Sequence, residues 1–168
     1  MHGRNYDKKE KIQKVIEKGF GLDIVDWEHA RARVSDAKRD YIFEIVMKGI
    51  ELSQVTLVLF TDDEEVEMRS KFLDKSDKLE ISFKDRRKRR RQARPNVYIE
   101  AGYALGVRPN RTIFLEWPDD LSVFSSPSDF QGIHVIKYND TPESRKILKN
   151  RLECARCLLN LDPGWDKI

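Results

Sequence analysis

The chain has 168 residues, of which 39% are hydrophobic and 36% charged, and its formal net charge is +3. This size is enough for one domain with a buried core, and this composition excludes a disordered chain. The apolar runs are about half a dozen residues long, far short of the roughly 20 that cross a bilayer. The polar N-terminus shows no signal peptide, so we expect a cytoplasmic protein without a membrane partner.

The small net charge hides two opposite charge blocks. Residues 84–94 contain eight basic side chains and one acid, a net charge of +7, so the remaining chain carries −4. Five acids lie within residues 62–67, and we expect the two blocks to attract each other. Nucleic-acid binding through the basic run ranks last among our hypotheses, because no aromatic residue interrupts it and the rest of the chain is acidic.

The first half of the chain alternates helical and strand patterns. Ile12, Val15 and Ile16 predict a helix over residues 8–21, which ends at the glycines near its C-terminus. The β-branched run 22–27 predicts a short strand. A second helix, with Ser35 or Asp36 as its cap, is expected to extend to Leu52.

The second half continues the alternation. Residues 55–60 predict a strand buried on both faces, and residues 61–93 a polar excursion with one helix near 64–73. Asn96 is a suitable cap for the next helix, because its side chain can accept a backbone hydrogen bond. Two further strands (111–117 and 133–138) and a closing helix that opens at Thr141 (141–161) complete the pattern.

This order of elements predicts an α/β fold with a doubly wound parallel sheet of about four to five strands. We expect one domain over residues 1–168, with a charged excursion at about 61–94. Only Met1 and His2 precede the turn "GRN", so we expect the first strand of such a sheet to be truncated or very short.

Glu100 is the most unusual residue of the sequence. It lies in "ARPNVYIEAGYAL", a helix that is apolar around most of its circumference. A carboxylate removed from water costs several kcal/mol unless it is paired or hydrogen-bonded. Two explanations follow: Glu100 is bonded to a basic residue such as Arg4 or Arg94, or it lines a cleft.

Polar clusters follow the expected strands at the edge where doubly wound sheets bind ligands, the carboxyl ends of the strands. They are residues 2–5, 27–36, 61–64 and the start of the Glu100 helix. Cys154 and Cys157 form a lone C-x-x-C, which is a weak metal signal, and we expect two ordinary thiols and no metal site.

The segments "HGRN", "VTLVLFTDD", "RQARPNVYIEAGYALG" and "SDFQGI" resemble the bacterial TIR-like nucleotide-binding domains, which are found in bacterial STING proteins and in Pycsar effectors. The resemblance implies a flavodoxin-like fold, cleavage of NAD⁺ into nicotinamide and an ADP-ribose product in anti-phage defence, and activation by self-assembly. It places the catalytic glutamate at Glu100. The chain departs from the family in lacking the first strand, in its second loop "HARARVSD", and in its longer basic excursion.

The chemistry of this reaction suits a single carboxylate. Breaking the nicotinamide–ribose bond passes through an oxocarbenium-like transition state, which one nearby negative charge can stabilise. We therefore expect NAD⁺ or a related nucleotide as substrate and no cofactor. Aromatic side chains could stack on the nicotinamide or adenine, and arginines could hold the pyrophosphate. The expected substrate-binding residues are His2, Gly3, Arg4, Trp27, Arg33, Ser35, Asp62, Arg94, Asn96 and Tyr103, with Arg31 as a further arginine candidate.

The alternative is a nucleotide-binding or signalling module without turnover, which self-associates through the same TIR-like surfaces.

Overall fold

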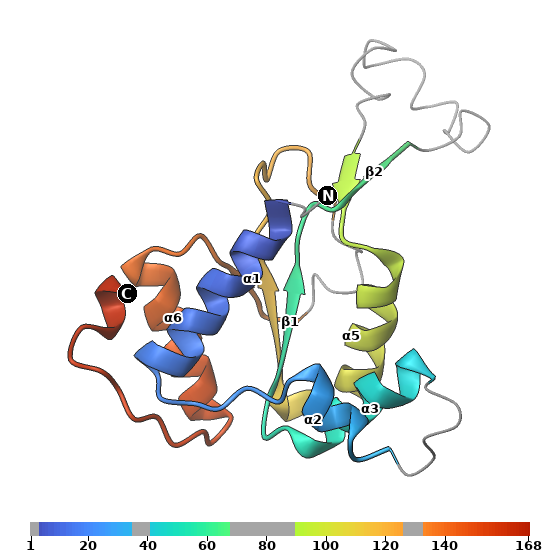
Figure 1. Cartoon of the computed structure of the whole chain (residues 1–168). Helices are drawn as coiled ribbons and strands as arrows, with labels where there is room; N and C mark the ends of the chain where they lie inside the picture. The colour runs from blue at the N-terminus through green and yellow to red at the C-terminus, as the bar shows by residue number, and fades with distance from the viewer. Residues whose placement is uncertain (1–3, 35–40, 68–89, 126–132) are drawn as a thin grey trace.

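A three-stranded parallel sheet forms the centre of the molecule. The computed structural model describes residues 4–34, 41–67, 90–125 and 133–168. The strands are β1 (Thr56–Phe60), β4 (Thr112–Glu116) and β5 (Val135–Lys137), in the order β1-β4-β5 (Figure 1). Thr56 is in register with Thr112, and Phe114 with Val135. The predicted α/β fold with a parallel sheet is confirmed, and the three later strand predictions are correct to within a few residues. The sheet has three strands in the described residues, where about four to five were predicted.

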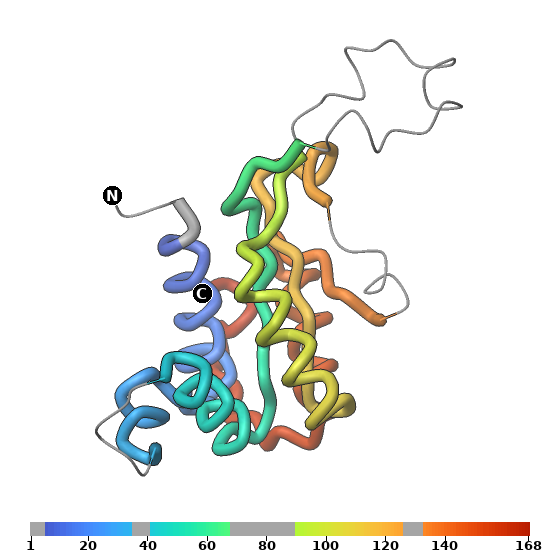
Figure 2. The backbone as a smooth tube through the Cα atoms, turned by 90° about the vertical axis from the view of Figure 1, so that its right-hand side faces the viewer, coloured from blue at the N-terminus to red at the C-terminus, as the bar shows by residue number. Residues whose placement is uncertain are grey.

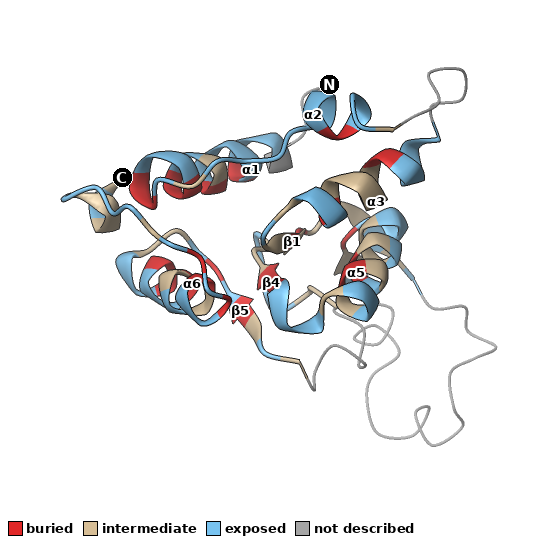
Figure 3. Ribbon diagram, turned by 90° about the horizontal axis from the view of Figure 1, so that it is seen from below, coloured by how far each residue is buried: buried red, intermediate tan, exposed pale blue. Residues whose placement is uncertain are grey.

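Helices cover both faces of this sheet (Figure 3). One face carries α1 (Arg4–Lys14), its π-helical continuation η1 (Val15–Gly19) and α6 (Pro142–Cys154). The other face carries α3 (Ile42–Leu52) and α5 (Pro95–Val107), with the short α2 (Trp27–Arg31) packed against α3. Burial on both faces explains why the strand sequences show apolar runs without alternation.

Two apolar clusters hold the layers together. On the α1 and α6 side, Phe20, Leu115, Leu148 and Leu152 are at most 2% exposed. On the α5 side, Phe60 and Phe114 stack with ring centroids 5.8 Å apart and belong to the cluster that contains the buried helix alanines 101 and 104. Each fully buried aliphatic or aromatic side chain contributes roughly 1.5–3 kcal/mol, so these clusters dominate the stability of the fold.

The predicted strand at 22–27 is wrong. Residues 21–26 have no regular structure, and α2 begins at Trp27, with the Asp26 side chain accepting a hydrogen bond from the His29 backbone. Ile24 and Val25 are 37% and 38% exposed. A strand requires a hydrogen-bonding partner, and residues 22–27 pair with no described strand.

The charged excursion contains a β-ladder at its base. The strands β2 (Glu64–Val66) and β3 (Arg90–Gln92) pair antiparallel, with Glu65 opposite Arg91. The helix predicted near 64–73 is therefore wrong at its start, and its remainder, from residue 68, lies outside the described residues. The expected attraction between the acidic and basic blocks is confirmed here, because the Arg91 guanidinium lies 3.3 Å from the Asp62 carboxylate and 3.9 Å from that of Glu65. Cross-strand pairs of opposite charge stabilise such a ladder.

Helix boundaries differ from the predictions for simple reasons. Helix α5 begins at Pro95 with Arg94 in the capping position, so Asn96 is not its N-cap; the fixed φ of proline suits the first helical turn. Helix α6 begins after Thr141 as predicted, with a capping box between Thr141 and Ser144, but it ends at Cys154. Two short 3₁₀ turns complete the described elements: η4 (Pro109–Arg111) between α5 and β4, and η6 (Trp165–Lys167) after α6.

None of the described helices has the length and apolar character of a transmembrane span.

Candidate active site

Glu100 lies in the middle of α5, on one flank of the helix. The alanines at 101 and 104 face the sheet and are fully buried, whereas Glu100 itself is half-buried. No described residue forms a hydrogen bond or ion pair with its carboxylate. Removal from water raises the pKa of Glu100 above its ordinary value of 4.5, and burial is the only cause. A carboxylate whose pKa is perturbed by burial is a candidate for a functional group.

Asn96 and Tyr103 share the flank of α5 that carries Glu100, since residues spaced by three or four lie on one side of a helix. Asn96 is exposed, and Tyr103 is half-buried. The Tyr103 ring meets Phe43 of α3 edge-on, with ring centroids 5.9 Å apart. Glu100 therefore lies one turn from the contact that joins α5 to α3.

A buried ionic junction lies at the carboxyl ends of the strands. Asp62 is the second residue after β1, and its side chain is 2% exposed. It is bonded to the Lys8 ammonium at 3.4 Å, to the Arg91 guanidinium at 3.3 Å and to the backbone N–H of Asp119 at 3.1 Å. Lys8 also donates to the Trp117 carbonyl at 2.8 Å. The junction joins α1, the ends of β1 and β4, and β3.

The junction also fixes the ionisation of Asp62. Burial alone would raise the pKa of this carboxyl, but the backbone N–H of Asp119 and the positive charge of Lys8 outweigh it and hold the pKa below its ordinary value of 3.8. Asp62 is thus placed at the edge predicted for ligands, with its carboxylate engaged in holding that edge together.

The structure divides the predicted binding residues into two groups. The segment after β1 and the start of α5, which carry Asp62, Arg94 and Asn96, lie at the end of the sheet where β1 finishes and the β2–β3 ladder begins (Figures 1 and 2). Trp27 and Arg33 belong to α2 and the turn after it, at the opposite end, where β1 begins. Both are exposed, Trp27 by 44%. Glu100 and Tyr103 lie between the two groups along α5.

Four predicted residues are not described in full. His2, Gly3 and Ser35 lie outside the described residues, and Arg4 is described only as the first backbone position of α1. Glu100 and Arg94 form no hydrogen bond or ion pair with each other. A pairing of Glu100 with Arg4 falls outside what is described.

Sequence reasoning missed Lys8 and Phe43. Lys8 is 7% exposed and lies four residues before Ile12, which itself lies four before Ile16. A lysine in line with an apolar stripe is a readable signal for a buried cation. Phe43 stands among several apolar residues of α3, and no pattern distinguishes it from them. Its role depends on how α3 packs against α5.

Metal chemistry has no obvious ligands in the described ranges. Nowhere in them do three or more His, Cys, Asp or Glu side chains gather as a metal site would require. Cys154 and Cys157 are free thiols, exposed and buried respectively, and burial raises the pKa of Cys157.

Comparison with known proteins identifies the family. No curated protein and no solved structure matches the chain. The family model described as "CAP12/Pycsar effector protein, TIR domain" matches residues 1–140, which include Glu100, Asp62 and all three strands of the sheet. Helix α6 follows the matched region. The chain therefore belongs to the TIR-domain family of CAP12/Pycsar effector proteins.

Proposed function

We propose that this protein is an NAD⁺ nucleosidase that breaks the bond between nicotinamide and ribose. Membership of the TIR effector family supports this proposal, and so does the position of Glu100. The setting we infer is anti-phage defence, with activity switched on by self-association. NAD⁺ is the substrate, and no cofactor takes part.

The observation that carries the proposal is the state of the Glu100 carboxylate. It is half-buried and has no hydrogen-bonding or ionic partner among the described residues. Keeping a carboxylate in this state costs free energy, which a purely structural residue would not require. Its charge is available for a positive centre brought by a ligand.

The reaction needs this charge and a water molecule, which bonds to the anomeric carbon of the ribose as nicotinamide leaves and gives up a proton to solvent. Nicotinamide leaves as a neutral molecule from a cationic ring, so no acid has to protonate it. The ribose ring gains positive charge as the bond breaks, and the Glu100 carboxylate stabilises that charge while accepting hydrogen bonds from ribose hydroxyls. Partial removal from water strengthens the interaction, because the effective dielectric is lower than in bulk solvent.

The test is nicotinamide release from NAD⁺ by the clustered full chain and its Glu100→Gln variant. The amide keeps the shape and removes the charge, so we expect release to fall by about 100-fold or more. Glu143→Gln removes an exposed carboxylate at the start of α6 and serves as the control, with expected release near wild type. Equal release from wild type and Glu100→Gln would overturn the proposed mechanism.

A second function is supported by the exposed apolar side chains of α3 and α5. Ile42 is 68% exposed and Ile99 59%, and burying both against another copy would remove apolar surface from water. A module that binds a nucleotide and self-associates, without turnover, would use the same features. It predicts saturable NAD⁺ binding by calorimetry with no nicotinamide released in any assembly state.

A further inference from the structure

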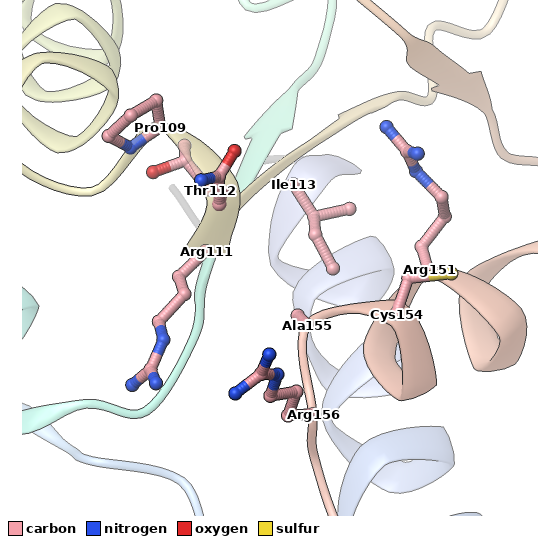
Figure 4. Close-up of a pocket in the computed structure, with 9 residues that line it drawn as sticks. Pro109, Arg111, Thr112, Ile113, Arg151, Cys154, Ala155 and Arg156 are labelled. Atoms are coloured by element: carbon pink, nitrogen blue, oxygen red, sulfur yellow. The ribbon is translucent and has the colours of Figure 1, made fainter.

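A polar hollow of about 550 Å³ lies at the end of the sheet away from the Asp62 junction. The turn η4, the first residues of β4 and the last turn of α6 form its walls (Figure 4). Three arginines line it: Arg111 from η4, Arg151 from α6, and Arg156 just after α6. No acidic residue is among the lining residues.

The guanidinium groups of these three arginines form no hydrogen bond or ion pair with any described residue. Other arginines nearby are engaged. Arg108 donates to the carbonyls of Glu51 and Ser53, and Arg145 pairs with Asp140 at 2.9 Å. Arg108 and Arg145 thus have structural roles that the three lining arginines lack.

Three positive charges line one hollow that has no acidic lining residue, and a bound anion would neutralise part of this charge. The C-terminal end of α6 opposes an anion, because helix ends of this kind carry partial negative charge. That effect is reduced here, since the carbonyls of Arg151, Leu152 and Glu153 accept backbone hydrogen bonds from Ala155, Cys157 and Arg156. We infer that the three arginine charges outweigh the partial negative charge at the C-terminal end of α6.

We propose that this hollow is a binding site for the phosphate or diphosphate group of a small ligand. Guanidinium groups bind phosphate oxygens with two parallel hydrogen bonds, and three of them suit a ligand with more than one negative charge. The volume is that of a small-molecule site. No aromatic residue lines the hollow, so the recognition is of charge rather than of a base. The site is separate from Glu100 and does not depend on the proposed reaction.

The proposal is tested by calorimetric titration of the full chain with inorganic pyrophosphate at low and moderate salt. Arg111→Gln with Arg156→Gln removes two of the three charges at exposed positions. We expect this double variant to bind pyrophosphate about tenfold more weakly or worse, because it loses two of the three guanidinium groups that would bind the phosphate oxygens. ADP is titrated in the same way: affinity no greater than that of pyrophosphate is expected for recognition of charge alone, and clearly tighter binding of ADP would assign the site to a nucleotide diphosphate.

The matched control is Lys18→Gln with Lys146→Gln. Both lysines are exposed and lie outside the hollow, so this variant loses the same total charge. We expect it to bind pyrophosphate as the wild type does, and Glu100→Gln to do the same. Absence of pyrophosphate binding, or an equal loss in both double variants, would overturn the proposal. Tight binding of duplex DNA that pyrophosphate does not displace, and that is lost in the arginine variant, would assign the surface to nucleic acid instead.

Cys154 gives an independent readout, because it lines the hollow and is exposed, whereas Cys157 is buried. Pyrophosphate should slow alkylation of Cys154 in the wild type and leave its rate unchanged in the arginine double variant. An unchanged rate in the wild type at saturating pyrophosphate would place the anion elsewhere and contradict the proposed site.

Discussion

On the proposed mechanism, the raised pKa of Glu100 should make activity depend on pH. Its pKa is raised above 4.5 by burial, and the ionised form is the one that stabilises a cationic sugar. Activity should therefore rise with pH through a midpoint above 4.5. The pH profile of nicotinamide release by the wild type, measured from pH 4 to 8, checks this. A midpoint at or below 4.5 would mean that another group controls the reaction.

The same residue should lower stability at neutral pH. A carboxyl whose pKa is higher in the folded state favours folding when protonated, so this contribution is lost as pH rises from 4.5 through the raised value. The glutamine side chain in Glu100→Gln is uncharged at every pH, so it makes no such pH-dependent contribution to stability. Thermal melting should give similar Tm values for both proteins near pH 4 and a higher Tm for the variant at pH 7. A lower Tm for the variant at pH 7 would show that the charge is structurally paired.

Asp62 has the opposite character, although sequence reasoning placed both residues in one site. Its lowered pKa contributes stability that is present above 3.8 and is lost as pH falls through the lowered value. Asp62→Asn weakens the contacts to Lys8 and Arg91 and should cost about 2 kcal/mol of unfolding free energy at pH 7. Urea unfolding measures this, with exposed Asp23→Asn as the control. Equal stability of the two variants would remove the junction from the account of the fold.

At the scale of elements, two glycines should respond oppositely to alanine. Gly21 ends the first helix with φ +63°, and an added Cβ would lie 2.7 Å from the Asn160 carbonyl oxygen. Gly102 lies on the exposed side of α5, where an added Cβ meets nothing within 4 Å. Gly21→Ala should cost about 2 kcal/mol, whereas Gly102→Ala should add about 0.8 kcal/mol. Unfolding free energies from urea titration test both, and a stabilised Gly21→Ala would refute the assigned backbone.

Most elements could be predicted because their signals are local. The apolar run of β1, the stripe of α1 and the Thr141 cap of α6 depend only on nearby residues. The segment 22–27 has equally good local signals for a strand, and it fails because pairing is a property of the sheet. The β2–β3 ladder was missed for the same reason, since its strands are joined through residues far apart in sequence.

At the scale of the whole molecule, the candidate site was only partly predictable. Glu100 could be found because a lone acid in an apolar helix contradicts its surroundings. The separation of Asp62 from Trp27 and Arg33, at opposite ends of the sheet, could not be predicted, because it depends on where β1 ends and where α2 packs. The hollow with Arg111, Arg151 and Arg156 escaped sequence reasoning because η4 and the end of α6 meet only in the folded chain.

The central claim is that the negative charge of Glu100 stabilises the cationic ribose while the nicotinamide–ribose bond of NAD⁺ breaks. Its most direct test is to incubate NAD⁺ with clustered wild-type protein and with equally folded Glu100→Gln, and to quantify nicotinamide by chromatography. We predict nicotinamide in stoichiometric amounts with the NAD⁺ consumed by the wild type, and about 100-fold less from the variant. Nicotinamide formed at the same rate by both proteins, or by neither in any assembly state, would contradict the account.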